Sequence, residues 1–145
     1  MYASGGHVAA DPVRAVKLFQ EACDGGDGAG CARVAPMYEM ATGTVRDMKK
    51  ALAAYMKACD AGDHQSCARY ARHERQGQHL ARNVPRALER LQAACTAGVG
   101  DACLELGDVF ENAEGVARDR LRALGLYKQA CAAGQQRACQ IVKYR

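Results

Sequence analysis

Eight cysteines are the side chains of this 145-residue sequence whose spacing points most directly to chemistry. They fall into four pairs, with eight positions from the first cysteine of a pair to the second and 36 positions from one pair to the next. The pairs are Cys23 and Cys31, Cys59 and Cys67, Cys95 and Cys103, and Cys131 and Cys139. Thiols in such pairs can form disulfides, bind a metal or remain reduced in a core.

The 36-residue period selects one of the roughly one hundred ways to pair eight cysteines, namely the one that bonds each cysteine to its partner eight positions away. A zinc site is less favoured, because zinc cysteines usually come in C-x2-C pairs, and buried reduced thiols are the remaining alternative. The sequence contains no C-x-x-C redox or haem motif. We predict four structural disulfides and no metal or other cofactor, with each bond closing a loop of about nine residues and contributing about 2.5 kcal/mol.

The composition restricts the compartment and the classes of partner that we expect for this chain. Persistent disulfides indicate an oxidising compartment, so we expect a periplasmic or secreted protein. The first residues hold no charged segment followed by an apolar stretch, and we expect no signal peptide in this sequence. No apolar run approaches the roughly 18 residues of a membrane span. The net charge is only +4 without a basic run, which gives little support to nucleic-acid binding.

Other residues recur with the same period and predict the elements that carry the cysteines. A column of N-capping residues precedes each first helix, and a column of glycines ends it, where a left-handed residue is needed. The capping column is Asp11, Asp47, Asn83 and Asp119, and the glycine column is Gly26, Gly62, Gly98 and Gly134. Between them, apolar residues such as Ala51, Leu52, Tyr55 and Ala58 follow one helical stripe.

The period therefore predicts an all-α fold, a solenoid of about four helical hairpins that each hold one disulfide. We assign residues 1–145 to one solenoid domain, with a partial repeat at 1–10 and repeats at about 11–46, 47–82, 83–118 and 119–145. We expect each second helix to begin near Cys31, Cys67 or Cys103 and to end near Gly43, Gln78 or Gly115. Pro36 falls inside such a helix and is expected to kink it or end it early.

These columns resemble Sel1-like repeats, which are relatives of tetratricopeptide repeats. The resemblance rests on the stretch from Asp47 to Gly62 (DMKKALAAYMKACDAG) and on that from Cys103 to Phe110 (CLELGDVF). A cysteine at each end of the inter-helix turn is similar to the cysteine-rich branch known from Helicobacter. The resemblance implies an α/α superhelix whose concave surface is lined mainly by first helices. It also implies protein or peptide binding, and some relatives are described as penicillin-binding proteins or β-lactamases.

The residues themselves give the enzyme hypothesis little support. A serine β-lactamase needs Ser-x-x-Lys, and neither Ser4 nor Ser66 starts that motif. The four histidines form no H-x-x-x-H pair, and four bonded cysteine pairs leave no nucleophilic thiol. We therefore predict no catalytic residue.

Two columns of basic residues are the first candidates for binding. Arg14, Lys50, Arg86 and Arg122 stand three residues after each cap, and Arg46, Arg82 and Arg118 stand just before a cap. Stacked repeats would place these cations along one edge, as a ridge for an anion or an acidic peptide. The alternative is that their stems pack across repeat junctions while their heads are solvated. Further groove candidates on first helices are Lys17, Gln20, Lys57, Glu89, Gln92 and Lys128.

The second repeat departs from its neighbours at two positions. Glu74 stands in a column where Tyr38 and Phe110 are aromatic, and His73 replaces apolar residues. One interpretation is a local polar site formed by His73, Glu74 and His79. The other is a tolerated, more solvated helix.

The favoured function is a non-catalytic scaffold that binds a protein or peptide in an oxidising compartment. One alternative is a binder or hydrolase of β-lactams or peptidoglycan-derived peptides. Another is a secreted effector that binds host proteins.

Overall fold

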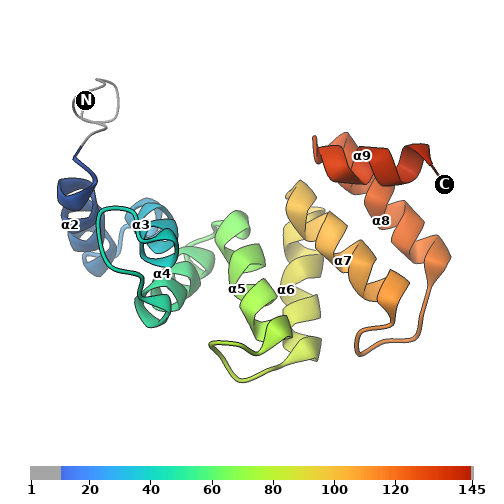
Figure 1. Ribbon diagram of the computed structural model, residues 1–145, viewed down its shortest axis with the longest axis horizontal. Coiled ribbons are helices and arrows are strands. Elements are labelled where there is room, and N and C mark those ends of the chain that lie inside the picture. Colours follow the sequence, from blue (N-terminus) through green and yellow to red (C-terminus); the bar gives the residue numbers. More distant parts are fainter. Residues whose placement is uncertain (1–10, 145) are drawn as a thin grey trace. The chain divides into compact units, whose positions relative to one another are not determined.

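The computed structural model describes residues 11–144 (Figure 1). In this range all regular structure is helical, which confirms the predicted all-α class. Seven helices have 13 residues each and the last has 8. They are α2 (Pro12–Asp24), α3 (Gly28–Met40), α4 (Met48–Asp60), α5 (His64–Gln76), α6 (Val84–Thr96), α7 (Gly100–Asn112), α8 (Arg120–Ala132) and α9 (Gln136–Lys143).

The described residues divide into two compact units, 11–66 and 67–144. In the first unit, α3 packs against both α2 and α4. In the second, α7 packs against α6 and α8, and α9 packs against α8. Large side chains fill each interior, with Val34 and Tyr55 in the first unit and Leu91, Leu106 and Tyr127 in the second. The second helices α3 and α7 therefore each pack against the first helices on both sides.

The predicted N-caps hold the start of each first helix. Asp11, Asp47, Asn83 and Asp119 each accept, at 3.0–3.1 Å, the backbone N–H of the residue three positions later. From Asp47 onward, the backbone N–H of each capping residue also donates a hydrogen bond to the preceding hairpin. The N–H of Asp47 donates to the carbonyl of Tyr38, and that of Asp119 to Phe110, at 3.0 and 3.1 Å. The capping residue thus both ends the preceding loop and starts the helix.

The predicted turn glycines are also confirmed. Gly26, Gly62, Gly98 and Gly134 have φ between 94° and 101°, in the region that side-chain-bearing residues rarely adopt. Each lies between a first helix and the second helix that follows. The turn keeps these two helices antiparallel and close enough for a disulfide.

The cysteine prediction is confirmed in the described chain. Cys23 is bonded to Cys31, Cys95 to Cys103, and Cys131 to Cys139, with Cα–Cα distances of 4.5–4.6 Å. Cys59 and Cys67 are likewise disulfide-bonded, so no free cysteine remains. Each bond joins the last turn of a first helix to the first turn of the second helix.

The predicted starts of the second helices were wrong. The second helices begin at Gly28, His64 and Gly100, three residues before the expected cysteines. Asp27 caps the first of them by accepting the N–H of Ala29, and Asp63 caps the next by accepting the N–H of Ser66. The turn is therefore shorter than expected, and the cysteine lies inside the helix.

Pro36 does not end its helix, because α3 continues to Met40. The equivalent helix α7, which has no proline, also ends after 13 residues. Pro36 removes one main-chain donor, while the neighbouring Val34, Ala35 and Tyr38 are buried and hold the helix by packing.

Candidate functional site

Two grooves at equivalent places in the repeat, one in each unit, are the candidate binding sites. The first groove lies on α2, α3 and α4 and is lined by Gln20, Cys23, Asp24, Tyr38, Lys50, Ala53, Ala54 and Lys57. The second groove lies on α6, α7 and α8 and is lined by Pro85, Leu88, Glu89, Gln92, Ala93, Leu106, Phe110 and Arg122. Gln20, Tyr38 and Lys50 correspond to Gln92, Phe110 and Arg122, two repeats later.

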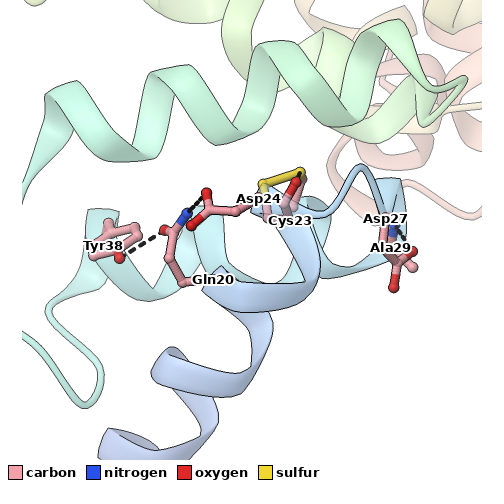
Figure 2. Close-up of a disulfide and its surroundings, with 7 residues drawn as sticks. Gln20, Cys23, Asp24, Asp27, Ala29 and Tyr38 are labelled. Atoms are coloured by element: carbon pink, nitrogen blue, oxygen red, sulfur yellow. Dashed lines mark hydrogen bonds between the residues drawn. A yellow bond between two sulfur atoms is a disulfide. The ribbon is translucent and has the colours of Figure 1, made fainter.

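In the first groove a short chain of hydrogen bonds fixes one amide (Figure 2). The hydroxyl of Tyr38 donates to Oε1 of Gln20 at 2.8 Å, and Nε2 of Gln20 donates to Oδ1 of Asp24 at 2.7 Å. Nζ of Lys50 lies 5.6 Å from the centroid of the Tyr38 ring. Since Tyr38 is only 5% exposed, its hydroxyl is a rigid donor, and the Gln20 amide has one orientation.

The second groove uses the same positions differently. The guanidinium carbon of Arg122 lies 4.3 Å from the centroid of the Phe110 ring, a cation–π contact. Nη2 of Arg122 is 3.5 Å from Oε1 of Gln92, and Nε2 of Gln92 is 3.4 Å from Oγ1 of Thr96. Leu88 and Leu106 add apolar surface beside Phe110. This groove is therefore more apolar, and its cation lies against the groove wall.

The structure sorts the predicted binding residues into two groups. Gln20, Lys50 and Lys57 share the first groove, and Glu89, Gln92 and Arg122 share the second. Arg14, Lys17, Arg86 and Lys128 are exposed but line neither groove. For all of these residues a binding role stays a prediction.

In the second basic column, Arg82 and Arg118 contact other residues of the protein. Nε of Arg82 donates to the carbonyl of Arg75 at 3.1 Å, at the end of α5. Nη2 of Arg118 lies 3.6 Å from Oε2 of Glu111. The Arg82 guanidinium is favourable at the C-terminus of α5, because it meets a carbonyl of the last turn. These contacts favour the packing interpretation for this column.

The polar residues of the second repeat are buried, so the prediction of a more solvated helix was wrong. His73 is 7% exposed and Glu74 is 5% exposed. Oε1 of Glu74 accepts Nε of Arg90 at 2.9 Å, and the rings of His73 and His79 are 5.8 Å apart. Burial of a carboxylate is tolerated here because a guanidinium meets it.

Arg90 was missed in the sequence, although a signal for it exists. Its column reads Leu18, Ala54, Arg90 and Leu126, so the only charged member falls on α6, the helix directly after the one that carries Glu74. Tyr38 and Ala54 both line the first groove at the equivalent positions. An apolar contact in one repeat is thus an ion pair in another.

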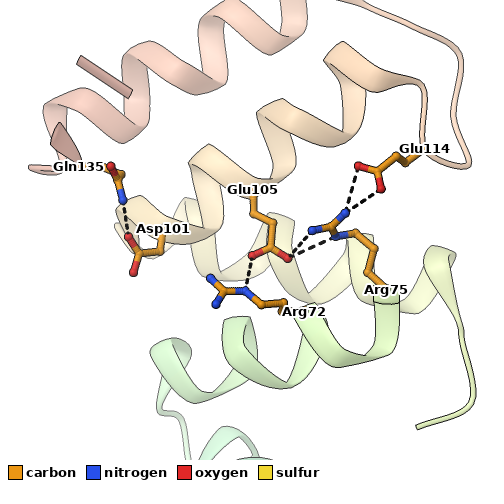
Figure 3. A network of polar contacts seen from close by, with 6 residues as sticks. All are labelled: Arg72, Arg75, Asp101, Glu105, Glu114 and Gln135. Atoms are coloured by element: carbon orange, nitrogen blue, oxygen red, sulfur yellow. Dashed lines mark hydrogen bonds and ion pairs between the residues drawn. The ribbon is translucent and has the colours of Figure 1, made fainter. Parts of the chain in front are cut away.

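A second ion-pair network on α5 and α7 was also missed (Figure 3). Glu105, 7% exposed, accepts Arg72 Nε at 3.1 Å and Arg75 Nη2 at 3.2 Å. Arg75 Nη1 also reaches Glu114 at 2.8 Å. Arg75 is the signal here, because its column has glutamate at Glu39 and Glu111. Charge reversal at this position lets α5 bind two carboxylates of α7 and of the loop that follows it.

Catalytic arrangements find no support in the described chain. Ser66 is 2% exposed and its hydroxyl donates to Asp63, which gives it a capping role. In residues 11–144, no three His, Cys, Asp or Glu side chains are arranged to hold a metal ion. Over the same range none of the helices combines the length and the apolar character that a membrane span requires.

Comparison with known proteins supports the repeat assignment. The Sel1 repeat model matches residues 1–27, 28–63, 64–99 and 100–135. The internal boundaries coincide with the first residues of α3, α5 and α7. A comparison with curated proteins found no match.

Three solved structures share the fold, each with less than 25% identity. Helicobacter pylori cysteine rich protein B is 23% identical with a TM-score of 0.69, over 95% of this chain and 99% of that one. A Sel1 repeat protein from Oxalobacter formigenes is 23% identical with a TM-score of 0.84, over 91% of this chain and 54% of that one. A protective antigen of uropathogenic Escherichia coli is 22% identical with a TM-score of 0.85, over 91% of this chain and 28% of that one. The chain thus spans about half or less of the last two proteins.

Proposed function

Because the chain belongs to the Sel1-repeat family, whose repeats typically mediate protein binding, we propose that it is a non-catalytic scaffold that holds an extended segment of a partner protein. The observation that carries the proposal is the pair of equivalent grooves on α2–α4 and α6–α8. Each combines an amide, a cation and a ring at matching positions. A groove with an amide, a cation and a ring offers contacts to both the main chain and the side chains of a peptide.

The proposed compartment is oxidising, either periplasmic or extracellular. All eight cysteines of the chain are in disulfides, and such bonds persist where glutathione and thioredoxin do not reduce them. The shared fold with a cysteine-rich Helicobacter protein is consistent with that setting.

The test is a selection from a display library of random peptides on the purified, oxidised protein. We expect a recurring peptide motif, and we expect selected peptides to bind more weakly to a variant carrying Lys50→Glu and Arg122→Glu. Lys49→Glu is the matched control, because Lys49 is exposed on the same helix as Lys50 but lines neither groove. Circular dichroism checks that all variants fold. If no motif is enriched, or if the double variant binds as well as the control, the groove scaffold is the wrong function.

A further inference from the structure

The first groove has two cations whose charges are balanced differently. Lys50 and Lys57 lie seven residues apart on α4, which is two helical turns or about 10.5 Å. Both are exposed and both line the groove. Within residues 11–144 neither ammonium group makes a hydrogen bond or an ion pair, and Nζ of Lys50 lies 5.6 Å from the centroid of the Tyr38 ring.

Among the residues that line the first groove, Asp24 alone carries a carboxylate, and the Asp47 carboxylate is occupied as the N-cap of α4. Asp24 lines the first groove and, together with Lys57 and Asp60, also lines an adjoining depression beside the Cys23–Cys31 bond. Lys50 does not line that depression. The charge of Lys57 is thus offset by two neighbouring acids, whereas no carboxylate lining the groove lies at the Lys50 end. The groove is therefore polarised, with its excess positive charge at Lys50.

Gln20 bonds to Tyr38, whose ring lies near Lys50, and to Asp24, which shares the adjoining depression with Lys57. An amide has two N–H donors and an oxygen with two lone pairs. Tyr38 uses one lone pair and Asp24 takes one N–H, so one donor and one acceptor remain (Figure 2). A peptide bond offers the complementary pair. The fixed amide can thus hold the main chain of a ligand without reorienting.

We propose that the first groove selects a peptide segment with an aspartate or glutamate side chain, which pairs with Lys50 while the main chain of the segment bonds to Gln20. This inference rests on the proposed peptide-binding function and names the chemistry of the ligand. The second groove does not share the selectivity, because Arg122 bonds to Gln92 and lies closer to its ring than Lys50 does, and because Gln129 replaces Lys57. Glu89 adds a negative charge to that groove.

The experiment uses an array of short peptides, acetylated and amidated at their ends, with each position in turn fixed as Glu, Asp, Gln, Lys or Leu. Binding of oxidised full-length protein is measured on every spot. For the wild type we expect at least one position where Glu and Asp exceed Gln by about fivefold, as an exposed charge pair allows. The preference should shrink when the salt concentration is raised to about 0.5 M.

Four variants locate the effect. Lys50→Gln should remove the acidic preference, and Lys50→Glu should turn it toward Lys. Lys57→Gln and Arg122→Gln should leave the ratio of Glu to Gln peptides nearly unchanged. A further variant, Gln20→Leu, should weaken all peptides and keep that ratio, because it removes a main-chain contact.

The outcomes separate this inference from the proposed function. Peptide binding without an acidic preference, or with a preference that survives Lys50→Gln, overturns the assigned selectivity and leaves the scaffold function in place. Absence of binding to any peptide, with variants and wild type folded by circular dichroism, overturns both.

Discussion

The two grooves contain the same amide at the same repeat position, and they use it in opposite ways. In the first groove the oxygen of Gln20 accepts the hydroxyl of Tyr38, and Lys50 is left facing the groove. In the second groove Phe110 has no hydroxyl, and the oxygen of Gln92 faces Arg122 instead. In both grooves the cation thus lies near the ring, but only in the second groove does it also hydrogen-bond the amide.

The scaffold around the grooves does not share this variation. Both have an aspartate cap at the start of the third helix, Asp47 or Asp119, and both have a disulfide across the first turn. The differences lie in side chains that face the groove. In a repeat protein the framework can therefore remain the same while each repeat acquires its own surface.

The junction of α5 and α6 departs most from this comparison. There Glu74 and Arg90 replace the aromatic and apolar residues found at Phe110 and Leu126. We expect Glu74→Ala to lower the free energy of unfolding by about 3–5 kcal/mol, because it leaves a largely buried guanidinium without its carboxylate. Chemical denaturation followed by circular dichroism without reductant measures the loss.

The matched control for that experiment gives the α5–α6 junction the residues of the equivalent α7–α8 junction. The double variant Glu74→Phe with Arg90→Leu introduces the residues of Phe110 and Leu126, and it should be neutral or more stable than the wild type. A double variant as unstable as Glu74→Ala would show that this junction requires its ion pair.

The disulfides give the next largest effect and should be alike in the two units. Replacing Cys23 and Cys31 by alanine, or Cys95 and Cys103, should each lower the free energy of unfolding by about 2.5 kcal/mol, since the closed loops have the same length. All four cysteines are at most 5% exposed, so alanine suits the sites better than serine. A loss in one unit of less than half that in the other would contradict the equivalence.

Two glycines show where the units are packed differently. A Cβ on Gly30 would lie 2.7 Å from Cβ of Ala22, and one on Gly107 would lie 2.7 Å from the Tyr127 ring. The equivalent residues in the other unit are Ala102 and Ala35, both fully buried. We expect Gly30→Ala and Gly107→Ala each to lower the free energy of unfolding by about 1–2 kcal/mol through overpacking.

The reciprocal changes serve as controls. Ala102→Gly and Ala35→Gly should be destabilising by about 1 kcal/mol, because glycine loses more entropy in a helix. If Gly30→Ala instead raised the denaturation midpoint, helix propensity would outweigh the close contact.

Sequence reasoning succeeded where structure depends on local, repeated signals. The caps, the turn glycines and the disulfide pairing each involve residues within eight positions and recur in several repeats. It failed where two distant side chains had to be matched. Glu74 was singled out, but its partner Arg90 stands 16 positions away on another helix, and Arg75 reaches Glu114 over 39 positions. Such ion pairs can be predicted only when the repeat positions of one helix are compared with those of the helix that packs against it.

The smallest expected effect tests whether the hydroxyl of Tyr38 accounts for the difference between the grooves. In a Lys50→Gln background, Phe110→Tyr supplies the second groove with a donor for Gln92. That donor should displace Arg122 from the amide and give a preference of about twofold for Glu over Gln peptides, a gain of a few tenths of a kcal/mol typical of an exposed pair. The reverse change, Tyr38→Phe in otherwise wild-type protein, should lower the preference of the first groove, because the Gln20 oxygen then attracts Lys50. If Phe110→Tyr produces no preference for Glu over Gln peptides, the position of Arg122 is determined by its contact with the ring and not by its hydrogen bond to Gln92.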